Sequence, residues 1–135
     1  MATIGQIRDG IATNLSTISG LRITETVPDN PQPPTAIIQP ASIDYDRAMQ
    51  RGLDQYNFVV TVIVGRASER NAQNLLDLYC AGTGSSSVKV AIESNRTLSG
   101  VIQDLRVVSM RNYGSILVAE QTYLAAEFDL VVYTQ

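Results

Sequence analysis

The strongest strand pattern in the chain is residues 56–64, which read YNFVVTVIV. Side chains of a β-strand alternate between its two faces, and here a large apolar residue occupies every second position. The residues on that face are Tyr56, Phe58, Val60, Val62 and Val64. Val59 and Ile63 make the opposite face partly apolar as well, so we expect a strand that is covered on both sides.

Helical spacing of apolar residues occurs in three other segments. The first has isoleucine or leucine three or four residues apart, with Thr3 as its expected N-cap and Gly20 as its expected stop. Ser68 is the expected N-cap of the second, and the third begins within a run of serines. The expected helices are residues 4–18, 69–79 and 87–94.

The rest of the regular structure is expected to be strand. Pro40 should break one strand into two, Gly65 should end the strand that contains residues 56–64, and Asn112-Tyr113-Gly114 is typical of a hairpin turn. The other expected strands are residues 21–26, 35–39, 42–46, 105–110, 115–119 and 122–133. This order favours one α+β domain over residues 1–135, with a mostly antiparallel sheet and two to three helices packed on one face.

Two segments show neither the strand alternation nor the helical spacing of apolar residues. Residues 27–34 contain four prolines, so they are expected to form an extended connector, with a ligand for a proline-binding module as the alternative. Residues 47–54, RAMQRGLD, are expected to form a protruding loop.

The composition speaks against catalysis. The 135 residues include no His, a single Cys (Cys80) and a single Lys (Lys89). Most nucleophilic, acid–base and transition-metal chemistry uses His, paired Cys or an activated Lys, because these groups exchange protons or donate lone pairs near neutral pH. We therefore expect no enzyme activity and no cofactor or metal.

Charge and hydropathy exclude further classes. The net charge is −3 and the ten cations are scattered, whereas proteins that neutralise phosphates cluster their Lys and Arg. The sequence shows neither a run of about 18 apolar residues nor a signal-peptide pattern, so a protein made in the cytoplasm without a membrane span is expected. Cys80 is expected to be a buried, inert thiol at the end of a helix.

Three features resemble catalytic or ligand-binding motifs. Residues 82–87 are rich in Gly and Ser and precede a helix, but they lack the Lys of a phosphate-binding loop and are expected to be a linker between helices. Asp44, Asp46 and Asp54 lack the turn of a calcium loop. Glu127 and Asp129 share the outer face of the last strand. We expect these acidic residues to be solvated or salt-bridged.

A succession of short segments along nearly the whole chain resembles the tail terminator (tail-completion) proteins of long-tailed phages. The segments are Ile7-Arg8-Asp9-Gly10, Ser19-Gly20-Leu21-Arg22, residues 28–34, Ile43-Asp44-Tyr45-Asp46, residues 51–56, Val64-Gly65-Arg66-Ala67, residues 75–79, residues 84–89, Tyr113-Gly114 and residues 123–128. The resemblance implies an α+β subunit that forms a hexameric ring on the end of the tail tube, stops tube polymerisation and offers a docking face to the head connector. It carries over no catalytic residue.

The resemblance implies several partners: further copies of the chain, the tail tube protein and the head-tail connector protein. DNA would meet the ring only by passing through its lumen, and the protein would reside in the tail or neck of the virion. The expected interaction residues are Arg47, Met49, Arg51, Leu53, Asp54, Arg66 and Arg70. Outer-face apolar residues are either subunit interface or covered by helices, and these are Val59, Ile63, Val131 and Tyr133.

Two other functions stay open. The first is a head-completion or adaptor protein of the same neck, which a ring of twelve subunits would indicate. The second is an enzyme or small-ligand module that works through carboxylates alone, which a deep cleft containing both Asp44 and Asp54 would favour.

Overall fold

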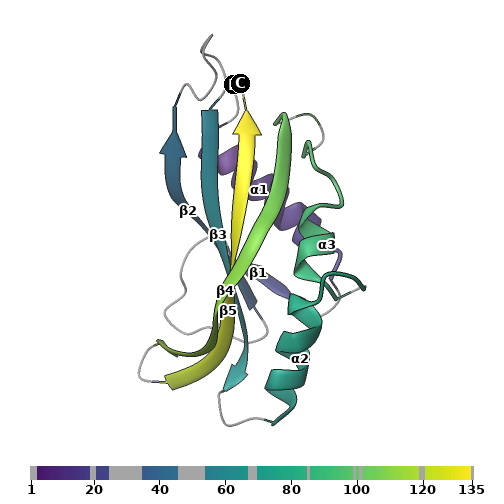
Figure 1. The fold of residues 1–135 in the computed structure, drawn as a ribbon, viewed down its shortest axis with the longest axis vertical. Coiled ribbons are helices and arrows are strands. Elements are labelled where there is room, and N and C mark those ends of the chain that lie inside the picture. The colour runs from purple at the N-terminus through teal and green to yellow at the C-terminus, as the bar shows by residue number, and fades with distance from the viewer. Residues whose placement is uncertain are drawn as a thin grey trace.

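The computed structural model describes residues 3–18, 21–24, 35–45, 54–66, 70–84, 86–98, 100, 102–118 and 121–134. Their helices and strands are, in chain order, α1 (Ile4–Leu15), β1 (Arg22–Thr24), β2 (Thr35–Asp44), β3 (Asp54–Arg66), α2 (Arg70–Cys80), α3 (Val88–Ile92), β4 (Asp104–Val118) and β5 (Gln121–Thr134). The long strands β3, β4 and β5 run side by side along most of the molecule (Figure 1).

The described strands form one five-stranded sheet in the order β1-β2-β3-β5-β4. β1 pairs with β2 in parallel, and the other neighbours are antiparallel. The expected fold class, α+β with a mostly antiparallel sheet, is therefore confirmed. This order places β3, which contains residues 56–64, in the centre of the sheet and β4 at its edge.

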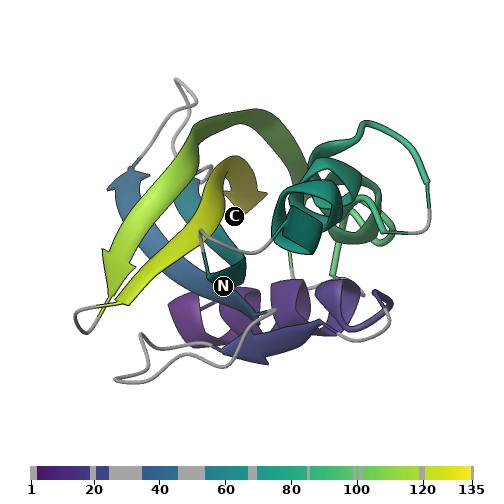
Figure 2. The same cartoon turned by 90° about the horizontal axis from the view of Figure 1, so that it is seen from below.

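The core forms on the face of β3 that the alternation predicts. Phe58 and Val60 are fully buried there, in one cluster with Ile11 of α1, Leu76 of α2 and Ile92 of α3. Seen from below, α1 lies along the bottom of the view and α2 and α3 lie at its right (Figure 2), while Figure 1 shows α3 above α2 on the same side of the molecule. All three described helices thus contribute buried side chains to the same core.

α1 begins where the sequence predicts and ends earlier. Thr3 caps it with a reciprocal capping box: Thr3 Oγ1 accepts from the Gln6 N–H at 3.1 Å, and Gln6 Oε1 accepts from the Thr3 N–H at 3.0 Å. The helix ends at Leu15, and Ser16 is its C-cap. Ser16 Oγ donates to the Thr13 carbonyl oxygen at 2.6 Å, which satisfies a helix-end carbonyl locally. The stop predicted at Gly20 lies outside the described residues.

The other two helices agree with their apolar spacing. α2 buries Ala72, Leu76 and Tyr79. Ser87 caps α3 by accepting from the Val90 N–H at 3.2 Å, and the described residues between the two helices form a linker, as expected. Ser68, the predicted cap of α2, lies outside the described residues, as do residues 27–34.

Two predicted strand breaks are wrong. β2 continues through Pro40 as one strand, and the pairing register with β3 shifts between Pro40 and Ser42. β3 likewise continues through Gly65 to Arg66, with a register shift between Ile63 and Gly65. At each position a β-bulge adds one residue to the strand, so the hydrogen-bond ladder is disturbed locally but continues on both sides.

The predicted hairpin at residues 112–114 is also wrong, because β4 is one strand of 15 residues. Arg111 pairs with Glu127 and Gly114 with Ala125, so three steps along β4 match two steps along β5. Asn112 takes the left-handed conformation with φ 57°, and Asn112 Nδ2 donates to Glu127 Oε1 at 2.6 Å. The residues that resemble a turn therefore form a bulge, where the same backbone freedom is needed.

The opposite face of the sheet is covered in part within the subunit. Ile63 is buried in a second cluster with Ile37, Tyr123 and Ala125. The interpretation of Ile63 as subunit interface is therefore wrong, since its own chain already buries it. The other three residues of that set, Val59, Val131 and Tyr133, are half-buried.

Two glycines of α1 give a matched test of packing. A Cβ on Gly10 would lie 2.8 Å from Leu98 Cδ1 and 3.0 Å from Leu98 Cβ, whereas a Cβ on Gly5 meets only Thr3 Oγ1 at 3.8 Å. Alanine favours a helix by about 1 kcal/mol over glycine, but overpacking costs about 1–3 kcal/mol. We expect Gly5→Ala to be the more stable variant, by about 2 kcal/mol, in urea denaturation. An equal gain at both positions would contradict the close approach.

Candidate interaction surface

Four of the expected interaction residues lie outside the described residues: Arg47, Met49, Arg51 and Leu53. The fifth, Asp54, was predicted to end a protruding loop, and that prediction is wrong. Asp54 is the first residue of β3, pairs in register with Thr134 of β5 and is 8% exposed. Burial of Tyr56 raises the pKa of its hydroxyl, and the nearby negative charge of Asp54 raises it further. Asp54 is therefore a buried residue of the sheet rather than part of an exposed contact surface.

The other two expected interaction residues, Arg66 and Arg70, lie close together in the chain. Arg66 is the last residue of β3, where it pairs with Tyr123, and Arg70 is the first residue of α2. Their side chains lie outside what the structure describes. Their backbone positions put both residues where the central strand leaves the sheet for α2, and their role in assembly stays a prediction.

The carboxylates considered for a metal or acid–base site do not converge. Asp44 pairs with Gln55, so these two share one face of the sheet, and Asp54 projects to the other because neighbouring residues of a strand alternate. Asp44 is exposed and accepts from Asn57 Nδ2 at 3.3 Å. Among the described residues, no group of three potential metal ligands comes together. Asp46 lies outside the described residues.

The acidic pair on β5 is salt-bridged, as expected. Arg111 of β4 donates from Nε to Asp129 Oδ2 at 2.9 Å, and its Nη2 lies 3.9 Å from Glu127 Oε2. The hydrogen bond and the two negative charges raise the pKa of Arg111. The bridge borders a hollow of about 280 Å³ on the sheet surface, whose lining includes Asn57, Val59, Val108, Arg111, Asp129 and Val131.

Exposed apolar side chains occur at the ends of several elements. Leu117 of β4 is 73% exposed, Tyr45 directly after β2 is 68% exposed, and Leu78 of α2 is 56% exposed. Val108 of β4 is 48% exposed at the hollow described above. These side chains are the described apolar surface most available to another protein.

Cys80 lies at the end of α2, as predicted, but it is half-buried rather than buried. Burial, followed by the charge of Asp77, raises the pKa of the thiol to about 11. The thiol is therefore protonated near neutral pH, and a protonated thiol is a weak nucleophile.

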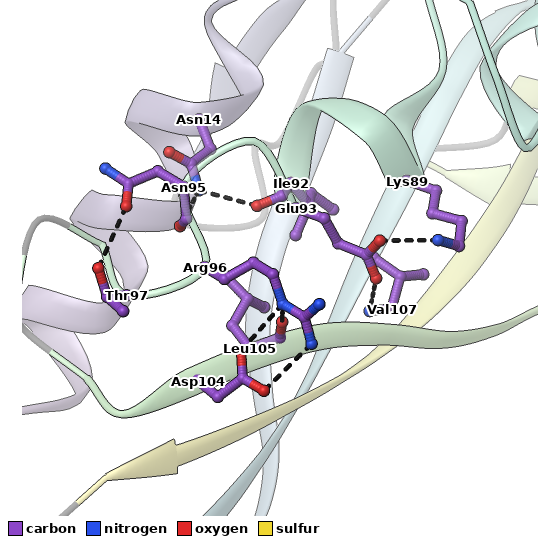
Figure 3. A network of polar contacts seen from close by, with 10 residues as sticks. All are labelled: Asn14, Lys89, Ile92, Glu93, Asn95, Arg96, Thr97, Asp104, Leu105 and Val107. Carbon is purple, nitrogen blue, oxygen red and sulfur yellow. Dashed lines mark hydrogen bonds and ion pairs between the residues drawn. The ribbon is translucent and has the colours of Figure 1, made fainter.

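A buried polar contact joins α1 to α3. Asn14 is 5% exposed, and its Nδ2 donates to the Ile92 carbonyl oxygen at 2.8 Å and to the Asn95 carbonyl oxygen at 3.1 Å (Figure 3). The last carbonyls of a helix lack partners within it, so the side chain of α1 satisfies the end of α3. A hollow of about 320 Å³ adjoins this contact between α1 and residues 95–98.

Two charged side chains after α3 bind the backbone of β4 (Figure 3). Glu93 Oε2 accepts from the Val107 N–H at 3.0 Å, while its Oε1 accepts from Lys89 Nζ at 2.7 Å. Arg96 Nε donates to Asp104 Oδ1 at 2.9 Å and to the Leu105 carbonyl oxygen at 3.3 Å. The segment after α3 is thereby fixed to the first residues of β4.

These contacts change the acidity of two carboxyls. Partial burial would raise the pKa of Glu93, but hydrogen bonds from Lys89 and the Val107 N–H, with the charges of Lys89 and Arg96, lower it. The pKa of Asp104 is lowered against its slight burial by the Leu105 N–H and by Arg96. A carboxyl whose pKa is lowered by folding stabilises the folded state at neutral pH, and this contribution is lost as the pH falls through the folded pKa.

The sequence reasoning missed Asn14, Glu93 and Arg96. Lys89 and Glu93 lie four residues apart, which is the spacing of a helical ion pair and was available as a signal. Asn14 and Arg96 gave no such signal, because their partners lie on other elements and depend on the folded arrangement.

Among the described helices, none has both the length and the apolar character needed to cross a membrane. No protein-family model and no curated protein matches the chain.

Proposed function

We propose that this chain is a structural virion protein that forms a ring on the end of a phage tail tube, ends tube polymerisation and joins the tail to the head connector. The proposal rests on the resemblance to tail terminator proteins along nearly the whole sequence. The α+β fold, which that resemblance implied, supports it. The ring is expected to hold six copies, with the tail tube protein on one side and the connector protein on the other.

The exposed apolar side chains support a protein that works by contact. Leu117, Tyr45 and Leu78 each expose more than half of their surface, and burying such groups against partners supplies binding free energy. In this role the task is geometric: the ring covers the surface on which the next ring of tube subunits would add. The free energy then comes from interface area, on the order of 1,000 Å² or more for a specific contact. DNA passes only through the lumen.

A head-completion or adaptor protein of the neck is the alternative, and the number of subunits separates the two. Native mass spectrometry of the purified chain bound to tail tubes, after release of the ring, is the test. The tail terminator proposal predicts six times the subunit mass of 14.7 kDa. Twelve times that mass would favour the adaptor, and a single subunit would contradict both.

Arg66 and Arg70 give the sharpest test of how the ring assembles. We expect Arg66→Glu and Arg70→Glu each to weaken assembly on tail tubes while leaving the urea denaturation midpoint nearly unchanged, because charge reversal at a subunit contact opposes association. Arg22→Glu is the matched control, because it reverses the charge of an exposed arginine on β1, the edge strand two positions away from β3 in the sheet. If both variants assemble and stop tails normally, these residues are not at the interface.

A further inference from the structure

The β4 edge is where this sheet is most open to pairing with another chain. β4 lies at the end of the strand order, and within the described residues it pairs only with β5. At 15 residues it is also the longest described strand. The outward N–H and C=O groups of a long edge strand form a template on which a second copy of the same chain can add.

The first part of that edge is occupied by side chains of its own subunit. The Leu105 carbonyl accepts from Arg96 Nε at 3.3 Å, and the Val107 N–H donates to Glu93 Oε2 at 3.0 Å. Leu105 and Val107 are two residues apart, so their backbone groups point to the same side of the strand. Since these groups bond to side chains after α3 rather than to β5, that side is the open edge.

The two side chains are themselves held in place. Lys89 Nζ donates to Glu93 Oε1 at 2.7 Å, and Arg96 binds Asp104 through two hydrogen bonds, of 2.9 and 3.1 Å. Asn14 holds the backbone between them by donating to the Asn95 carbonyl at 3.1 Å. Each group that meets the edge is thus fixed by a second contact.

The later part of β4 is irregular. One extra residue enters β4 between Val107 and Ser109, and another enters between Arg111 and Gly114. Bulges interrupt the even spacing of backbone groups that an added strand requires. The register of β4 with β5 is therefore regular over three stretches, residues 104–107, 109–111 and 114–118, and the first of them is the one that Glu93 and Arg96 cover.

We propose that Glu93 and Arg96 guard the β4 edge by occupying the backbone groups of Leu105 and Val107 with which a second copy of this chain would otherwise pair. Subunit contacts in any assembly then use surfaces other than this stretch of edge. The inference does not depend on the ring, because it concerns an association that the native chain avoids.

The test compares the full wild-type chain with the double variant Glu93→Ala/Arg96→Ala by sedimentation velocity over a range of concentrations. We expect the double variant to show self-association beyond that of the wild type, with an apparent dissociation constant lower by roughly tenfold or more, the scale of one or two hydrogen bonds. Amide hydrogen exchange locates the contact: Val107 should exchange faster in the dilute variant and become protected again when it associates.

Two controls separate edge protection from loss of charge. Lys89→Ala removes the ion pair but leaves both backbone contacts, and Glu93→Gln keeps a carbonyl oxygen that accepts from the Val107 N–H. Both should sediment as the wild type does. A folded double variant with fast exchange at Val107 and wild-type mass at every concentration would overturn the proposal, as would association that leaves Val107 unprotected. Should the double variant unfold, Glu93→Ala alone decides by the same two measurements.

Discussion

Replacing Phe58 by alanine is expected to lower the free energy of unfolding by about 3–5 kcal/mol, the range for a fully buried aromatic side chain. Phe58 is 1% exposed in the centre of β3, within the cluster that joins all three described helices to the sheet. Domains of this kind are stable by about 5–15 kcal/mol, so the variant should be partly unfolded at 37 °C if the wild type lies near the lower end. Urea denaturation followed by circular dichroism measures the change.

Val59 is the matched control, because it is the next residue of the same strand and faces the other side of the sheet. It is half-buried, so Val59→Ala should cost about 1 kcal/mol or less. Equal losses at the two positions would show that the two faces of β3 are equally packed, contrary to the alternation described above.

Replacing Asn14 by leucine is expected to cost about 1–3 kcal/mol, since the buried Ile92 carbonyl loses its donor while the Asn95 carbonyl still accepts from the Leu98 N–H at 3.2 Å. Asn14 Nδ2 donates to the Ile92 and Asn95 carbonyl oxygens, and Asn14 is only 5% exposed. Leucine keeps a similar volume but offers no hydrogen bond. The free energy of unfolding from urea denaturation gives the size of the effect.

Thr13→Ala serves as the control for Asn14. Thr13 precedes Asn14 in α1, is exposed, and its Oγ1 donates only to the Asp9 carbonyl within the same helix. Its replacement should change stability by about 0.5 kcal/mol or less. A loss at Asn14 no larger than at Thr13 would mean that the buried amide contributes little to the packing of α1 on α3.

Local pattern was enough to predict most of the elements. The alternation around Phe58 identified the central strand, and Thr3 was correctly predicted as the N-cap of α1. Pro40, Gly65 and Asn112 misled the prediction for one shared reason. Each favours a local departure from ideal strand geometry, and only pairing with a long neighbouring strand decides whether that departure is a break or a bulge.

The candidate surface was harder to predict than the fold. Asp54 looked like part of a loop because it follows Arg51-Gly52-Leu53, but its register with Thr134 draws it into the sheet. The contacts of Glu93 and Arg96 depend on which side of β4 faces outward, and that is set by long-range strand order. Sequence spacing along one element does not contain this information.

The most direct test of the proposed function is the length of tails made without this protein. Electron microscopy of lysates should compare a phage that encodes the chain, the same phage with the gene removed, and the deletion complemented in trans. If the chain ends tube polymerisation, the deletion should give overlong tails that are not joined to heads, and complementation should restore the normal length. Tails of normal length joined to filled heads in the absence of the protein would contradict the account.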